Sequence, residues 1–183
     1  MLATEKAWEI FKKADLIHSA QLVSDTVTRL AGEISAQLAD KQPLVLSVMG
    51  GATVFAGQLL PQLEFPLDFD YVQVSRYGDA IRGGQMTWKV PPPVNVKGRV
   101  VLVLDDILDE GITLAEIRAS VLELGAAECF CAVFVNKQIG RPKPIHADFI
   151  GLEVPDRYVF GFGMDVHGAW RNLPAIYALK EEY

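Results

Sequence analysis

Hydrophobic residues recur along the chain with two different periods, which predict both helices and strands. Within residues 19–39 they recur at steps of three and four, and Ser19 stands just before them as a candidate N-cap. This spacing predicts an amphipathic helix. The residues that carry the pattern are Val23, Val27, Leu30, Ile34 and Leu38.

Continuous apolar runs predict buried strands at several further places. The predicted strands cover residues 43–51, 69–78, 100–106, 128–137, 147–154 and 157–163. Helices are predicted over residues 52–63 and 112–126, with Gly125 at the end of the second. This order predicts an α/β fold, with a mostly parallel twisted sheet flanked by helices. Ligands bind such sheets at the carboxyl ends of the strands, which here fall on Met49-Gly50-Gly51, Asp105-Asp106 and Asn136-Lys137.

Residues 79–97 do not fit this alternation. They contain Gly83-Gly84 and three consecutive prolines at 91–93, which predict a hairpin arm. A long loop or arm in a compact domain is more often functional than idle. A plain solvent-exposed hairpin is the alternative.

Composition and charge narrow the class of protein. A chain of 183 residues with 50% hydrophobic residues predicts a single globular domain over 1–183. The net charge of -6 argues against nucleic acid or an anionic membrane as the main partner. Cys129 and Cys131 fall on one face of a predicted strand, which predicts buried thiols and a reducing compartment. The first residues are not expected to form a signal peptide, and no run of about 18 apolar residues occurs, so a cytoplasmic location is expected.

The stretch VVLVLDDILDEGITL, residues 100–114, carries the strongest chemical signal. An apolar strand leads into two adjacent carboxylates, followed by two more, a glycine and a threonine. The helix that opens near Ile112 has unpartnered first N–H groups with partial positive charge, which suit a phosphate. The carboxylates can accept hydrogen bonds from sugar hydroxyls, hold Mg²⁺ or take a proton. The stretch therefore favours a phosphorylated ribose over its alternative, a solvated acidic loop that caps a helix.

The same stretch resembles the phosphoribosyl-pyrophosphate (PRPP) signature of the type I phosphoribosyltransferases. Downstream, FVNKQIGRPKP and ADFIGLEVPDRYVFGFGMDVHGAWRNLPAIYAL resemble the C-terminal half of the hypoxanthine-guanine phosphoribosyltransferases. The similarity extends from about residue 16 to 179. It implies the type I phosphoribosyltransferase fold, with a flexible lid arm at about 75–97 and a small base-binding hood at about 137–183.

The resemblance also implies an activity. A hypoxanthine-guanine phosphoribosyltransferase transfers the 5-phosphoribosyl group from PRPP to N9 of the base and releases pyrophosphate. The products are IMP or GMP, the reaction depends on Mg²⁺, and it serves purine salvage. Members are usually homodimers or homotetramers.

For PRPP, the resemblance implies that Asp105 and Asp106 bind the ribose hydroxyls, directly or through Mg²⁺. Met49, Gly50 and Arg171 would meet the pyrophosphate, and Tyr77 would belong to the lid. The 5′-phosphate would be wrapped by residues 109–113, which are Asp109, Glu110, Gly111, Ile112 and Thr113.

For the purine, the resemblance implies that Asp109 is the catalytic base and that Lys137 donates to the 6-oxo group. Tyr158 would stack on the ring, and the main chain at Val159 and Asp165 would read the 2-position. Asp165, together with Asp105, would also hold a Mg²⁺ ion.

The chain departs from the family pattern at three positions. Glu110 replaces a small hydroxyl residue in the phosphate loop, Met49 replaces a lysine common before Gly-Gly, and Arg76 replaces a serine. A carboxylate beside a phosphate is repelled, so Glu110 points to solvent, is offset by a neighbouring cation, or weakens PRPP binding. We expect it to point to solvent, and Arg76 is a candidate for the charge that Met49 lacks.

Two other functions remain open from the sequence. One is a preference for xanthine, because Lys137 suits any 6-oxopurine. The other is a non-catalytic regulator that senses PRPP or nucleotides and binds nucleic acid through a basic patch. The candidate patch residues are Arg82, Lys89, Lys97 and Arg99.

Overall fold

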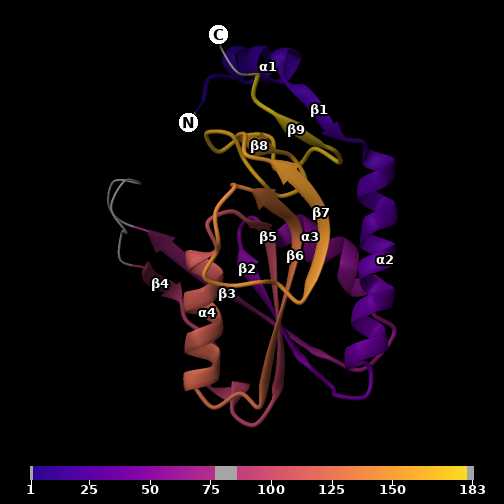
Figure 1. Ribbon diagram of the computed structural model, residues 1–183, viewed down its shortest axis with the longest axis vertical. Helices are drawn as coiled ribbons and strands as arrows, with labels where there is room; N and C mark the ends of the chain where they lie inside the picture. Colours follow the sequence, from indigo (N-terminus) through magenta and orange to yellow (C-terminus); the bar gives the residue numbers. More distant parts are fainter. Residues whose placement is uncertain (1, 77–85, 181–183) are drawn as a thin grey trace.

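A six-stranded sheet forms the centre of the protein, in a computed structural model that describes residues 2–76 and 86–180 (Figure 1). Its strand order is β4-β3-β2-β5-β6-β7. All neighbours are parallel except the antiparallel pair β3–β4. The predicted mostly parallel α/β fold is confirmed. The strands are β2 (Leu44–Met49), β3 (Asp68–Arg76), β4 (Met86–Val90), β5 (Val100–Leu108), β6 (Glu128–Gln138) and β7 (Phe149–Pro155).

Helices cover both faces of this sheet because its strands present apolar side chains alternately to the two sides. In β5, Leu102 and Leu104 pack in one core cluster with α2 (Ala20–Leu38) and α3 (Thr53–Leu59). Val101 and Val103 pack in the other cluster with α4 (Ile112–Glu123). Ser19 caps α2 as predicted, since its hydroxyl accepts the Leu22 amide at 3.3 Å.

A second, smaller sheet of order β1-β9-β8 lies beyond the carboxyl ends of the main strands, and its strands β8 and β9 fall within the predicted hood at about 137–183 (Figure 1). Its strands are β1 (Asp15–His18), β8 (Val159–Phe160) and β9 (Ile176–Ala178), and α1 (Thr4–Lys13) packs on it. The predicted strand over residues 157–163 is therefore too long. The chain leaves extended geometry at Gly161, Phe162 and Gly163, which all have positive φ.

The predicted arm begins as an antiparallel pair, in which Ser75 of β3 lies opposite Thr87 of β4. Gly83-Gly84 and Tyr77 lie outside the described residues, as does the side chain of Arg76. Two short 3-10 helices, η1 (Leu60–Gln62) and η2 (Val94–Val96), complete the fold. Cys129 and Cys131 are buried free thiols, as predicted. In the part of the chain that is described, no helix is long and apolar enough to cross a membrane.

Candidate active site

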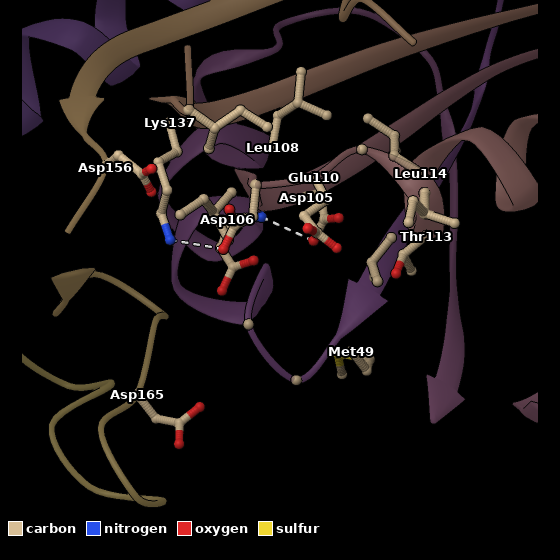
Figure 2. Close-up of a pocket in the computed structure, with 18 of the residues that line it drawn as sticks. Met49, Asp105, Asp106, Leu108, Glu110, Thr113, Leu114, Lys137, Asp156 and Asp165 are labelled. Carbon is tan, nitrogen blue, oxygen red and sulfur yellow. Dashed lines mark hydrogen bonds and ion pairs between the residues drawn. The ribbon is translucent and has the colours of Figure 1, made fainter. Parts of the chain in front are cut away.

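A cleft of about 740 Å³ lies at the carboxyl ends of β2, β5 and β6 (Figure 2). All three predicted strand ends contribute to its wall: Met49-Gly50-Gly51, Asp105-Asp106 and Lys137. Parallel strands bring their carboxyl ends to one edge, which is why residues distant in sequence meet here. The β5 strand continues to Leu108, two residues past its predicted end, because it keeps pairing with Val135 and Asn136 of β6.

The two adjacent carboxylates of β5 are almost completely buried. Asp105 is 8% exposed and Asp106 is 9% exposed. Burial raises the pKa of both, and the neighbouring Asp106 charge raises the pKa of Asp105 further. For Asp106 the effect of burial is partly offset by its hydrogen bond with Asp105 and then by the charge of Arg171, which both lower its pKa. Two such carboxylates favour a cation or several hydroxyl donors opposite them.

Glycines allow three segments to meet at Asp106. A Cβ on Gly51 would lie 1.9 Å from Oδ2 of Asp106, and a Cβ on Gly163 would lie 2.1 Å from the Gly51 carbonyl oxygen. No side chain can be added at either place without moving backbone or the carboxylate. The peptide between Met49 and Gly50 is cis, and Gly50 is exposed on the cleft wall.

Residues 109–113 form the turn from β5 into α4. Gly111 has φ 82, and it packs tightly because an added Cβ would meet Ile145 Cγ2 at 3.2 Å. The amides of Gly111 and Ile112 have no acceptor inside the helix, and both residues line the cleft. The start of α4 therefore presents amide donors to the cleft, where an anion could accept their hydrogen bonds.

Glu110 is exposed, as expected, and it also has a cationic neighbour. Its Oε1 accepts a hydrogen bond from the guanidinium of Arg141, which lies in the connection between β6 and β7. Arg141 lines the same cleft and was not identified from the sequence. Glu110 thus both points to solvent and is offset by a neighbouring cation, which are two of the three possibilities that the sequence left open.

Lys137 lies at the end of β6 and is directed at a carboxylate of the cleft. Its Nζ donates to Oδ2 of Asp109 at 2.7 Å, the ion pair drawn as a dashed line at Lys137 in Figure 2. The Lys137 side chain is 12% exposed, so its stem is fixed while its amino group reaches the cleft.

Lys143 was also missed from the sequence, and it fixes the wall behind Lys137. Its Nζ donates to the Leu108 carbonyl at 2.7 Å, to Asn136 Oδ1 at 2.6 Å and to the Lys137 carbonyl at 2.7 Å. Burial lowers the pKa of Lys143, while the Asp109 and Glu153 carboxylates oppose the shift. The Lys143 amino group therefore joins the ends of β5 and β6 to the connection between β6 and β7.

A smaller pocket of about 220 Å³ opens between the cleft and the hood. Four predicted base-binding residues line it together: Lys137, Tyr158, Val159 and Asp165. The Tyr158 ring is half exposed, and burial, followed by the charge of Asp165, raises the pKa of its phenol. Its lining is shared with the cleft at Asp106, Ile107, Asp109, Lys137, Asp165 and Arg171.

Arg171 and Asp165 form an ion pair on the hood side of the cleft. Arg171 also donates to the Gly163 carbonyl at 2.6 Å, and Asp165 accepts the Gly168 amide at 2.7 Å. Both side chains are thereby held on the hood side of the cleft, and the charge of Arg171 acts on Asp106. Among the described residues, no group of three or more His, Cys, Asp or Glu could hold a metal ion by itself.

The hood is attached to the N-terminal segment by residues that the sequence did not indicate as important. Arg157 donates to Asp15 Oδ2 at 2.6 Å and to the Leu179 carbonyl at 2.7 Å. Trp170, next to Arg171, donates from Nε1 to the Ala7 carbonyl at 2.9 Å. The base pocket therefore depends on both ends of the chain.

Comparison with known proteins gives consistent matches over most of the chain. The family model for the phosphoribosyl transferase domain matches residues 13–167. A hypoxanthine-guanine-xanthine phosphoribosyltransferase of Tritrichomonas foetus is 32% identical over 167 residues, covering 91% of each protein. The hypoxanthine-guanine phosphoribosyltransferase of Bacillus subtilis is 32% identical over 163 residues, covering 88% of this chain and 91% of the relative.

Solved structures give the same result. One hypoxanthine-guanine-xanthine phosphoribosyltransferase superimposes with a TM-score of 0.78 at 30% identity, covering 93% of this chain and 97% of the other. A hypoxanthine-guanine phosphoribosyltransferase from Bacillus anthracis superimposes with a TM-score of 0.85 at 26% identity, covering 91% and 98%.

Proposed function

The chain belongs to the phosphoribosyl transferase family, and we propose that it is a purine salvage enzyme that joins hypoxanthine or guanine to PRPP. The 5-phosphoribosyl group passes to N9 of the base and pyrophosphate leaves. The observation that carries this proposal is the shared wall of two pockets. The carboxylate cleft suits a phosphorylated sugar, the smaller pocket suits a flat base, and Asp109 and Lys137 line both.

In this proposal, PRPP lies along the cleft with its 5′-phosphate, its ribose hydroxyls and its pyrophosphate at three different parts of the cleft wall. The 5′-phosphate accepts hydrogen bonds from the start of α4, at residues 109–113. The ribose hydroxyls donate to Asp105 and Asp106. The pyrophosphate meets the Met49 amide and Gly50, and Arg171 supplies a guanidinium to the leaving group.

The residues present fit Mg²⁺ as a cofactor. Mg²⁺ binds through one or two carboxylates and otherwise keeps water or phosphate oxygens, and Asp105 and Asp165 line this cleft. The raised pKa of Asp105 shows a buried carboxylate that a cation would stabilise in its charged form. When bound, Mg²⁺ would neutralise the charge that develops on the departing pyrophosphate.

Lys137 and Asp109 account for the choice and activation of the base. Lys137 donates to the 6-oxo group of the purine, and Asp109 accepts the proton that the purine loses. A 6-amino group would face Lys137 donor to donor, so adenine is rejected because buried polar groups would be left unpaired. Tyr158 stacks on the ring, and the main chain at Val159 and Asp165 reads the 2-position.

Two parts of the proposal concern organisation. Residues 1–183 form a single catalytic unit, in which the arm at about 75–97 is the lid and the hood at about 137–183 carries the base pocket. Tyr77, within the lid, contributes when the lid excludes water from the reactive sugar. The working protein is a homodimer or homotetramer.

The test is a measurement of pyrophosphate release with PRPP, Mg²⁺ and each of hypoxanthine, guanine, xanthine and adenine. We expect turnover with 6-oxopurines and none with adenine, and we expect Asp109→Asn to remove it. Absence of turnover with every base, despite PRPP binding, would exclude the enzyme and favour a regulator.

Xanthine is the second candidate substrate, because the T. foetus relative is named for it as well. The xanthine arm of the same assay decides this. The regulator is less well supported, because its candidate basic patch is partly neutralised. Arg99 pairs with Asp68 at 2.6 Å.

A further inference from the structure

Arg141 lies beside the loop that would hold the 5′-phosphate, and the family resemblance implied no role for it. We propose that Arg141 is a further substrate-binding residue that pairs with the 5′-phosphate of PRPP, and that Glu110 holds it in place until substrate binds. The proposal rests on the function proposed above. It assigns the phosphate specificity of the site partly to a side chain outside the 109–113 loop.

The chain segment that carries Arg141 is held in place by contacts of its neighbours in sequence. Lys143, two residues further on, is bonded to the Leu108 carbonyl directly before the loop. Gly111 packs against Ile145 and Lys143 of the same segment. The segment that carries Arg141 is therefore the side wall of the phosphate loop, and both Arg141 and Glu110 line the cleft.

The charges around the loop also point to Arg141. Among the described residues that line the cleft, the cations are Lys137, Arg141 and Arg171. Lys137 is engaged with Asp109 and Arg171 with Asp165 and the Gly163 carbonyl. Arg141 pairs instead with Glu110, a residue of the phosphate loop that has no proposed role toward the base or the metal.

The Glu110–Arg141 pair is suited to exchange. The side chains are 52% and 64% exposed, and ion pairs this exposed contribute little to stability. A phosphate dianion offers the guanidinium two charge-assisted hydrogen bonds and a larger charge. When the phosphate binds, Arg141 turns to it and Glu110 is left in solvent, where a carboxylate is stable.

The competing explanation is that Arg141 only neutralises Glu110 and never contacts the substrate. A double-mutant cycle separates the two explanations. The proteins are wild type, Arg141→Ala, Glu110→Gln and the Glu110→Gln/Arg141→Ala double variant. The measured quantities are the Kd of IMP, which carries the 5′-phosphate, and the Kd of inosine, which lacks it.

If Arg141 binds the phosphate, Arg141→Ala weakens IMP binding by about 10- to 100-fold, the range for a charge-assisted hydrogen bond, and changes inosine binding by less than about 2-fold. The double variant then binds IMP more weakly than Glu110→Gln by a similar factor. If Arg141 only neutralises Glu110, the double variant binds IMP as well as wild type, and the proposal is overturned.

Controls make the result specific. Lys41→Ala removes an ion pair that does not line the cleft, with Glu128 at 3.0 Å, and is expected to leave IMP binding unchanged. Arg141→Lys should restore part of the lost affinity, since it restores the charge without the planar fork. An equal loss of IMP and inosine binding in Arg141→Ala would show a structural role and also overturn the proposal.

Failure of the proposed function gives a different result. If wild type neither binds IMP nor releases pyrophosphate with any purine, both proposals are wrong. If wild type turns over and Arg141→Ala keeps the wild-type KM for PRPP, only the proposal for Arg141 is wrong.

Discussion

The close approach of Gly163 to Gly51 gives a prediction that can be worked out from distances. A Cβ at Gly163 would lie 2.1 Å from the Gly51 carbonyl oxygen, and Gly163 has φ +103. Overpacking of this kind costs about 1–3 kcal/mol. Left-handed backbone geometry for a residue with a Cβ costs about 1–2 kcal/mol more.

Gly163→Ala should therefore lower the free energy of unfolding by about 2–5 kcal/mol. For a chain of this size, each kcal/mol corresponds to about 2–4 °C, so the melting temperature should fall by about 4–20 °C. Gly51 also contacts Asp106, so the shift of backbone needed to admit the methyl group should reach the cleft and raise the KM for PRPP.

Gly168→Ala is the matched control. Gly168 has φ +84 and nothing within 4 Å of its added Cβ, so it carries the backbone cost without the clash. Its melting temperature should fall by about 2–8 °C. Thermal unfolding of both variants by circular dichroism makes the comparison. Equal losses, or a larger loss in Gly168→Ala, would refute the close approach at Gly163.

Three further predictions concern the polar residues of the site. Lys137→Ala should lower kcat/KM for hypoxanthine by about 10- to 150-fold, since it removes one charged hydrogen bond to the base. PRPP binding, measured by calorimetry, should change little, and a loss of PRPP binding instead would contradict the role of Lys137 toward the base. Lys143→Met leaves the Leu108 and Lys137 carbonyls without their shared donor. It should lower the free energy of unfolding, measured in urea, by about 1–3 kcal/mol, and an unchanged value would show that the three hydrogen bonds of Lys143 are dispensable. Asp105→Asn should raise the melting temperature at pH 7, because burial and Asp106 raise the pKa of Asp105 in the folded protein and the charged form is penalised. This gain should shrink as the pH falls below 3.8, where the carboxyl becomes protonated in both states, and a gain that does not depend on pH would contradict the assignment.

The sheet and the carboxylate loop were predictable because their signals are local. Apolar runs define the strands, and the sequence from Asp105 to Thr113 carries its chemistry within nine consecutive residues. That Gly50 and Lys137 lie at the same site was predictable from the parallel topology, since parallel strands have their carboxyl ends at one edge of the sheet. The base pocket was predictable only through resemblance, because Tyr158 and Asp165 carry no pattern of their own.

Other features depend on chain paths that no local pattern specifies. The contacts of Arg141 and Lys143 with residues 108–110 depend on the path of the segment between β6 and β7, so these partners could not be predicted from spacing in the sequence. Strands β1 and β9 have only four and three residues, too few for a periodic signal. The α1 helix was not predicted, although it carries a local charge signal, with Glu5 in its first turn and Lys12 and Lys13 in its last.

The central claim is that a 6-oxopurine receives the phosphoribosyl group in the pocket between Lys137 and Tyr158. The most direct measurement follows PRPP labelled with carbon-13 at the anomeric position by nuclear magnetic resonance, with Mg²⁺ and either hypoxanthine or adenine. The labelled carbon should become bonded to N9 of hypoxanthine, as pyrophosphate appears in equal amount, and adenine should remain free. Transfer to adenine, or release of the label only as ribose 5-phosphate, would contradict the account.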